Sequence, residues 1–113
     1  MISAAKINRD LHEGDVDTAI EIAVVEEDVS GDLVPVNISS ATILQIKFIS
    51  PDDTQITKTA VFSTDGSDGK MKYVTETGFL TPHGVWRKMG YLSMPNWTGH
   101  TEMSVFYVNP ALF

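Results

Sequence analysis

Alternation of apolar and polar residues along short segments is the feature that most limits the fold of this chain. Every second residue shares a character in runs such as 18–25, 42–50 and 84–94. A period of two is that of a β-strand, whose successive side chains point to opposite faces of a sheet. β-branched and aromatic residues dominate the runs, as a half-buried pleated surface favours. The sequence therefore predicts an all-β protein, with at most one helical turn at residues 76–80.

Turn-forming residues separate these runs. Pro51 follows Ser50 at a position suited to a type I turn, and Gly66 and Gly69 supply positions able to adopt positive φ. Pro95 begins a third break. Short strands with a turn every 8–12 residues are typical of an immunoglobulin-like antiparallel β-sandwich. About seven strands are expected, at residues 18–25, 34–38, 42–50, 55–62, 70–75, 84–94 and 99–108.

The alternation also predicts which side chains fill the core. They are the apolar members of the inward set: Ile20, Ile22, Leu44, Ile46, Phe48, Phe62, Tyr73, Trp86, Leu92 and Phe106. Two residues on the same face as Trp86 interrupt the pattern. Lys88 is expected to reach the rim of the sandwich with its amine, and Gly90 predicts a bulge or the close approach of a ring such as that of Trp86.

The chain of 113 residues is long enough for one domain with a hydrophobic core. Residues 1–15 have weak periodicity and are expected to be an N-terminal arm, mobile or ordered on a partner. Residues 16–113 are expected to be the immunoglobulin-like domain.

Charge and composition exclude several functions. The formal net charge is −7, and residues 1–32 account for all of it with nine acids against two bases. Binding of nucleic acid through phosphates needs clustered Lys and Arg and is not expected. The acidic third is either a solvated surface or a means of steering toward a basic partner. No apolar run is long enough to span a membrane, and no signal-peptide pattern opens the chain.

Catalytic and metal chemistry have few candidate residues. There is no cysteine, and His12, His83 and His100 have no metal-ligand spacing. Asp65 and Asp68 offer two hard oxygen ligands for calcium, but a hairpin connection explains them as well. We expect no enzyme activity, no cofactor and no metal site.

Binding surfaces have stronger signals. Apolar residues also occupy the outward positions of two adjacent expected strands, and these residues form a candidate protein interface. They are Met89, Tyr91, Met103, Val105 and Tyr107. The alternative is that the N-terminal arm covers them with Ile2, Ile7 and Leu11. Trp97 lies at an expected hairpin tip, where its indole either contacts a glycan or a partner, or folds back over the end of the sandwich.

Several stretches taken in order resemble a known family. These are Gly14-Asp15, the strand with Ile20, Ile22 and Val24, residues 34–42, Ile46-Lys47-Phe48, residues 51–54, residues 57–60, residues 64–70, residues 73–76 and Gly84-Val85-Trp86. Their order and spacing over residues 14–108 resemble the immunoglobulin-like N-terminal domain of phage baseplate upper proteins.

That resemblance implies a structural protein of a tailed-phage virion, made in the bacterial cytoplasm. Its partners would be other virion proteins in the tail, baseplate, head–tail junction or capsid, with many copies in the particle. The family has no catalytic residues to transfer to this chain. The alternative function is a small adhesin that binds host-surface carbohydrate through Trp97.

Overall fold

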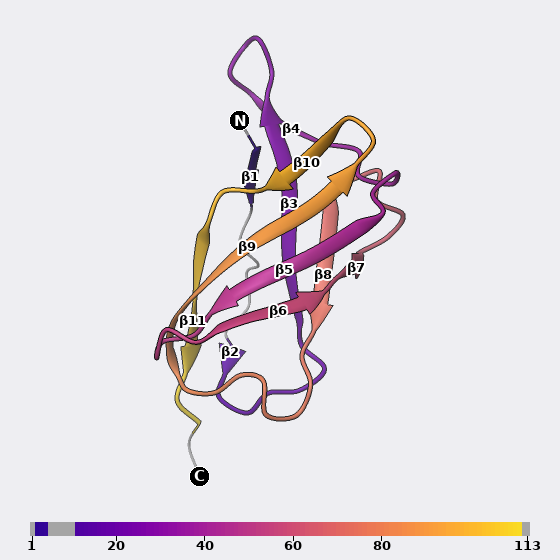
Figure 1. The fold of residues 1–113 in the computed structure, drawn as a ribbon. Helices are drawn as coiled ribbons and strands as arrows, with labels where there is room; N and C mark the ends of the chain where they lie inside the picture. Colours follow the sequence, from indigo (N-terminus) through magenta and orange to yellow (C-terminus); the bar gives the residue numbers. More distant parts are fainter. Residues whose placement is uncertain (1, 5–10, 112–113) are drawn as a thin grey trace.

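The strands form two sheets that pack face to face, with the hydrophobic core between them (Figure 1). The structure, a computed structural model, describes residues 2–4 and 11–111. The five-stranded sheet contains β1 (Ile2–Ala4), β3 (Ala19–Glu27), β8 (Lys70–Val74) and β7 (Val61–Phe62), with β4 (Leu33–Pro35) also paired to β3. The six-stranded sheet contains β2 (Leu11–His12), β11 (Ser104–Asn109), β9 (Gly84–Met94), β5 (Ile43–Ile49) and β6 (Gln55–Thr59), with β10 (Trp97–His100) paired to β9. The expected all-β sandwich is confirmed.

The expected strand at residues 55–62 is two strands in different sheets. β6 pairs with β5, whereas β7 pairs with β8 across the sandwich. Ala60 lies between them and is buried, and its N–H donates to the carbonyl of Leu44 at 2.9 Å. Period-two alternation continues through this crossing, so the sequence pattern alone does not reveal it.

The expected strand at residues 99–108 is also interrupted. β10 and β11 both pair with β9, and Thr101 lies between them. The Thr101 N–H donates to the carbonyl of Gly90 at 2.9 Å, and the Gly90 N–H donates to the Thr101 hydroxyl at 2.9 Å. The expected helical turn at residues 76–80 is wrong, because this segment is a non-helical turn with Phe79 and Leu80 buried.

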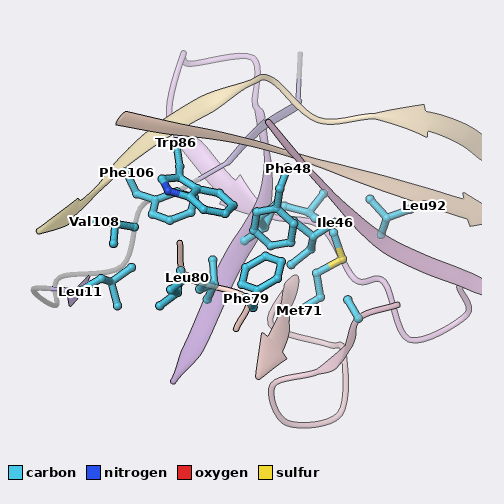
Figure 2. Packing of buried hydrophobic residues seen from close by; sticks show 14 of the residues in the cluster. Leu11, Ile46, Phe48, Met71, Phe79, Leu80, Trp86, Leu92, Phe106 and Val108 are labelled. Carbon is cyan, nitrogen blue, oxygen red and sulfur yellow. The ribbon is translucent and has the colours of Figure 1, made fainter. Parts of the chain in front are cut away.

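The aromatic rings of the core gather around Phe48 (Figure 2). Its ring centroid lies 4.9 Å from that of Phe79, 6.2 Å from that of Phe106 and 6.4 Å from that of Trp86. Burial of each such ring contributes about 1.5–3 kcal/mol. Of the ten expected core residues, seven are buried, and Leu44, Phe62 and Tyr73 pack against them half-buried. The core also includes residues outside that expectation: Leu11, Val24, Ile38, Ala60, Met71, Phe79, Leu80 and Val108.

The described part of residues 1–15 is paired with both sheets. β1 runs antiparallel to β3, and β2 runs parallel to the end of β11. Leu11 is 1% exposed and belongs to the core cluster. These short strands therefore join the N-terminal segment to the sandwich itself.

Lys88 does not reach the rim as expected. Its side chain is 1% exposed, and its Nζ donates to the backbone carbonyl of Glu21, in the opposite sheet, at 2.7 Å. The ammonium also lies 5.7 Å from the ring centroid of Phe106. Burial of a charged group requires such partners. Lys88 thus connects the two sheets through the core.

Gly90 makes room for a neighbour other than the one expected. A Cβ at this position would lie 2.5 Å from Cε of Met71 and 3.2 Å from Cγ2 of Thr101. The Trp86 ring is therefore not the neighbour that Gly90 admits. The other expectation, a bulge, is met on the partner strand, where residues 101–103 lie opposite Met89 and Gly90. The missing side chain admits Met71 from the five-stranded sheet.

Candidate functional site

The outer face of the six-stranded sheet brings together the residues expected to form an interface. Tyr107 on β11 pairs with Val85 on β9, and Val105 pairs with Arg87. Met89 and Tyr91 follow on the same side of β9, because side chains alternate along a strand. Met103 lies beside Met89 and Arg87 at the edge of a shallow hollow. We call this surface the outer face, defined by Lys47, Ile49, Val85, Arg87, Met89, Tyr91, Met103, Val105 and Tyr107.

Apolar side chains on the outer face are substantially exposed. Val85 is 57% exposed, Val105 and Tyr107 are each 51% exposed, and Met103 is 47% exposed. Met89 and Tyr91 are half-buried. Scattered exposed apolar residues are ordinary on a protein surface, whereas neighbouring ones on paired strands indicate an interaction site.

The N-terminal segment does not cover the outer face where it is described. Leu11 points into the core, and β1 belongs to the other sheet. The side chains of Ile2 and Ile7 lie outside the described residues. In the described part of the chain, therefore, nothing from residues 1–15 covers Val105 or Tyr107.

The outer face carries positive charge in a protein whose net charge is −7. Its outward strand positions hold Lys47 and Arg87 and no carboxylate among the described residues. Nζ of Lys47 lies 3.1 Å from Nε2 of His100 and 5.0 Å from the ring centroid of Tyr91. Arg87 pairs with Asp53 in the adjoining turn at 3.2 Å. The surface thus presents Lys47, and an Arg87 whose charge is partly offset by Asp53, beside exposed apolar groups.

A shallow hollow lies on the outer face between β5, β6 and β9. Its walls include Lys47, Ile49, Thr57, Arg87 and Met103. A hollow with apolar walls and a cationic rim can accept an apolar side chain next to a carboxylate.

Trp97 is half-buried at the end of the sandwich. It packs against the core cluster, and its ring atom Cζ2 would lie 3.0 Å from a Cβ at Gly99. This position agrees with the expectation that the indole of Trp97 folds back over the end of the sandwich. The indole is therefore partly covered by the sandwich instead of fully exposed at a hairpin tip.

Metal ligands do not cluster among the described residues, where no group of three or more His, Asp or Glu side chains is placed to hold an ion. The carboxylate of Asp65 accepts hydrogen bonds from the backbone N–H and hydroxyl of Ser67 at 2.9 and 2.6 Å, which lower its pKa. Asp68 accepts from Thr64 and Lys70. The calcium alternative therefore competes with a hairpin turn that already uses both carboxylates.

The other charged contact of note lies at the lateral opening between the sheets. Lys58 on β6 pairs with Glu76, which follows β8, and Tyr73 donates its hydroxyl proton to Glu76 at 2.9 Å. Lys58 lowers the pKa of the Glu76 carboxyl, and Glu76 raises the pKa of Lys58. Burial raises the pKa of Tyr73. This contact ties the two sheets together at their open side.

Lys47, Ile49, Val85 and Arg87 belong to the outer face but were not among the five expected interface residues. Val85 and Arg87 share the parity of Met89 and Tyr91, so extending the same alternation toward the start of the strand would have included them. Lys47 and Ile49 required the pairing of β5 with β9, which is a long-range contact.

Comparisons with known proteins show likeness in fold only. No family model matches the chain, and no curated protein matches it. Among solved structures, CopC from Methylosinus trichosporium OB3b matches with a TM-score of 0.58 and 9% sequence identity, over 100% of both chains. At this identity the match supports the sandwich and its extent along the whole chain. The described residues include no helix long and apolar enough to cross a membrane.

The expectation of a tailed-phage virion protein, with a host-glycan adhesin as its alternative, is wrong. CopC, a solved structure that matches along the entire chain, is not a phage protein. The resemblance rested on turns and strand order, which unrelated β-sandwiches share. Fold similarity therefore accounts for those motifs without a virion role.

Proposed function

We propose that this chain is a protein-binding module, not an enzyme, and that its binding surface is the outer face of the six-stranded sheet. The observation that carries the proposal is the cluster of half-exposed apolar side chains on β9 and β11, next to Lys47 and Arg87. Interface centres are enriched in Tyr, Met and Arg, which all occur here.

The charges on the outer face select the kind of partner. Lys47 and Arg87 would attract carboxylates, while Val105 and Tyr107 would bury apolar groups. The partner surface is therefore one that combines acidic and apolar or aromatic side chains. An isologous contact between two outer faces would place the cations of one copy near those of the other, which disfavours self-pairing through this surface.

A displayed library of random peptides tests the proposal. Peptides retained by the wild-type protein should combine Asp or Glu with aromatic or aliphatic residues. Tyr107→Glu should weaken their binding at least ~10-fold, because it places a carboxylate among the exposed apolar side chains of β9 and β11. The variant should stay folded, since Tyr107 is half-exposed.

Val74→Glu is the matched control. Val74 is 42% exposed on the outside of the five-stranded sheet, so the same substitution changes charge equally on the opposite side of the molecule. Binding to this control should stay within ~2-fold of wild type. Peptides that bind Tyr107→Glu as tightly as wild type, or a selection that yields basic peptides, would overturn the proposal.

A further inference from the structure

β6 is the last strand of the six-stranded sheet on its side (Figure 1). Among the described residues it pairs with β5 and with no other strand. A free strand edge presents backbone N–H and C=O groups that can pair with another chain.

The hydrogen-bond pattern of the β5–β6 hairpin shows which backbone groups of β6 are free. Ser50 N–H donates to Thr54 C=O at 3.0 Å, and Ala60 N–H donates to Leu44 C=O at 2.9 Å. The pairs Ser50–Thr54 and Leu44–Ala60 are the two ends of one ladder. Phe48–Ile56 and Ile46–Lys58 lie between them at every second position. Hydrogen-bonded pairs alternate along an antiparallel ladder. Ile56 and Lys58 therefore direct their backbone groups toward β5.

It follows that Gln55, Thr57 and Thr59 direct their N–H and C=O groups away from the sheet. Their side chains are exposed on the same side of the sheet as the outer face. Three consecutive sites of the free edge thus offer one donor and one acceptor each, at the spacing of an added strand.

The side chain of Lys58 does not block pairing along this edge. An inward-pointing lysine on an edge strand commonly prevents edge-to-edge pairing. Here Nζ of Lys58 is held by Glu76 and lies 5.7 Å from the ring centroids of both Tyr73 and Phe79. Beside it, a hollow lined by Ile56, Gly78 and Phe79 flanks the strand.

We infer that β6 pairs antiparallel with β6 of a second copy of this chain, about a two-fold axis at Thr57. In that register Thr57 opposes Thr57 of the second copy, and Gln55 opposes Thr59. All three pairs then consist of residues with free backbone groups, so about six hydrogen bonds can form at two per pair.

The side chains of this register are also compatible. Lys58 opposes Ile56 of the second copy, so no like charges face each other directly. Threonine pairs and glutamine–threonine pairs across strands can form hydrogen bonds. A second copy of β6 therefore pairs with all the free backbone groups and places no like charges opposite each other. Both properties favour self-pairing.

This pairing would join two six-stranded sheets into one continuous sheet, with both outer faces on the same side. If the proposed function holds, each dimer carries two binding faces, and a partner with two acidic–apolar segments gains from effective concentration. The dimer itself does not depend on the proposed function.

Sedimentation across a concentration series of roughly 10 µM to 1 mM tests the inference. The wild type should move from monomer to dimer. Thr57→Pro should remain monomeric and folded, because the Thr57 N–H makes no bond to β5 and proline is tolerated at such edge positions. Thr57→Val is the matched control: it keeps the N–H and should dimerise like the wild type.

A wild-type protein that stays monomeric throughout the series would overturn the inference, as would dimerisation of Thr57→Pro. Amide hydrogen exchange of the wild type covers the case in which Thr57→Pro fails to fold. The Gln55, Thr57 and Thr59 amides should gain protection as concentration rises, and unchanged exchange there would also overturn the inference.

Tyr107→Glu separates the two proposals. It should weaken peptide binding at least ~10-fold and leave the dimer intact, because Tyr107 lies on β11, which is separated from β6 by β9 and β5 in the sheet. If Tyr107→Glu abolished dimerisation, the self-contact would lie on the outer face and the edge pairing would be wrong.

Discussion

The outer sides of the two sheets differ in how their charges are used. On the five-stranded sheet, Glu21 pairs across strands with Lys72, and its carboxylate accepts from the hydroxyl of Ser63 at 2.8 Å. On the six-stranded sheet, the apolar side chains of Val105 and Tyr107 are half-exposed on β11, and Val105 lies opposite Arg87. Opposite charges on neighbouring strands stabilise each other on a solvated surface. The five-stranded sheet also exposes Val61 and Val74. Among the described residues, however, the exposed large apolar side chains that are aromatic or Met, Tyr107 and Met103, lie on the outer face, and these gain most from a partner.

The largest expected effect tests whether the outer face is independent of the core. Phe48→Ala should lower the free energy of unfolding by about 3–5 kcal/mol, because it opens a cavity among four aromatic neighbours. Lys47→Ala, one position away on the opposite face, should change it by less than about 0.5 kcal/mol. Urea denaturation measures both. A similar loss in the two variants would mean that the outer face supports the fold.

A second effect concerns the lysine that faces inward. Lys88→Ala should cost about 2–4 kcal/mol, because it leaves a cavity and removes the donor to the Glu21 carbonyl. Lys88→Met retains most of the side-chain volume and should cost about 1 kcal/mol. Equal losses in thermal or urea unfolding would show that the hydrogen bond outweighs packing at this position.

Charge reversal sharpens the contrast between the two outer sides. Lys47→Glu should weaken binding of an acidic–apolar peptide about 5–10-fold and more strongly at low salt. Lys72→Glu makes the same charge change on the five-stranded sheet and should leave binding within ~2-fold. Calorimetric titration of one selected peptide measures both. Equal weakening would mean that net charge, not the outer face, governs binding.

The smallest effect lies at the lateral opening, where Lys58 and Glu76 connect the sheets. Lys58 lowers the pKa of Glu76 in the folded state, so the stabilisation is present above pH 4.5, the ordinary value, and is lost as pH falls through the lower folded pKa. Glu76→Gln should therefore reduce the decline in Tm below pH 4.5. Identical acid profiles for variant and wild type would contradict this coupling.

Much of the fold and part of the candidate site could be predicted from the sequence. Alternation predicted the strand that became β9, and seven of ten expected core residues are buried. It also predicted that Met89, Tyr91, Val105 and Tyr107 would share a surface. These features follow from local geometry, because a two-residue period determines which side chains share a face.

Other features depend on partners far away in the sequence. Phe79 and Leu80 lie in a turn without periodicity, yet they fill the space below Phe48 and Trp86. The crossing at Ala60 from one sheet to the other leaves the alternation unbroken. Trp97 is half-buried because the end of the sandwich offers it an apolar surface.

The sequence by itself determined which segments are extended and how their side chains divide between two faces, since these depend on neighbouring residues. Only the tertiary structure decided which face of each sheet remains open, which strand is an edge and why Lys88 can be buried. Those outcomes depend on long-range pairing, as the bond from Lys88 to the Glu21 carbonyl of the opposite sheet illustrates. No local pattern encodes such a partner, because the two residues meet only when the sheets pack.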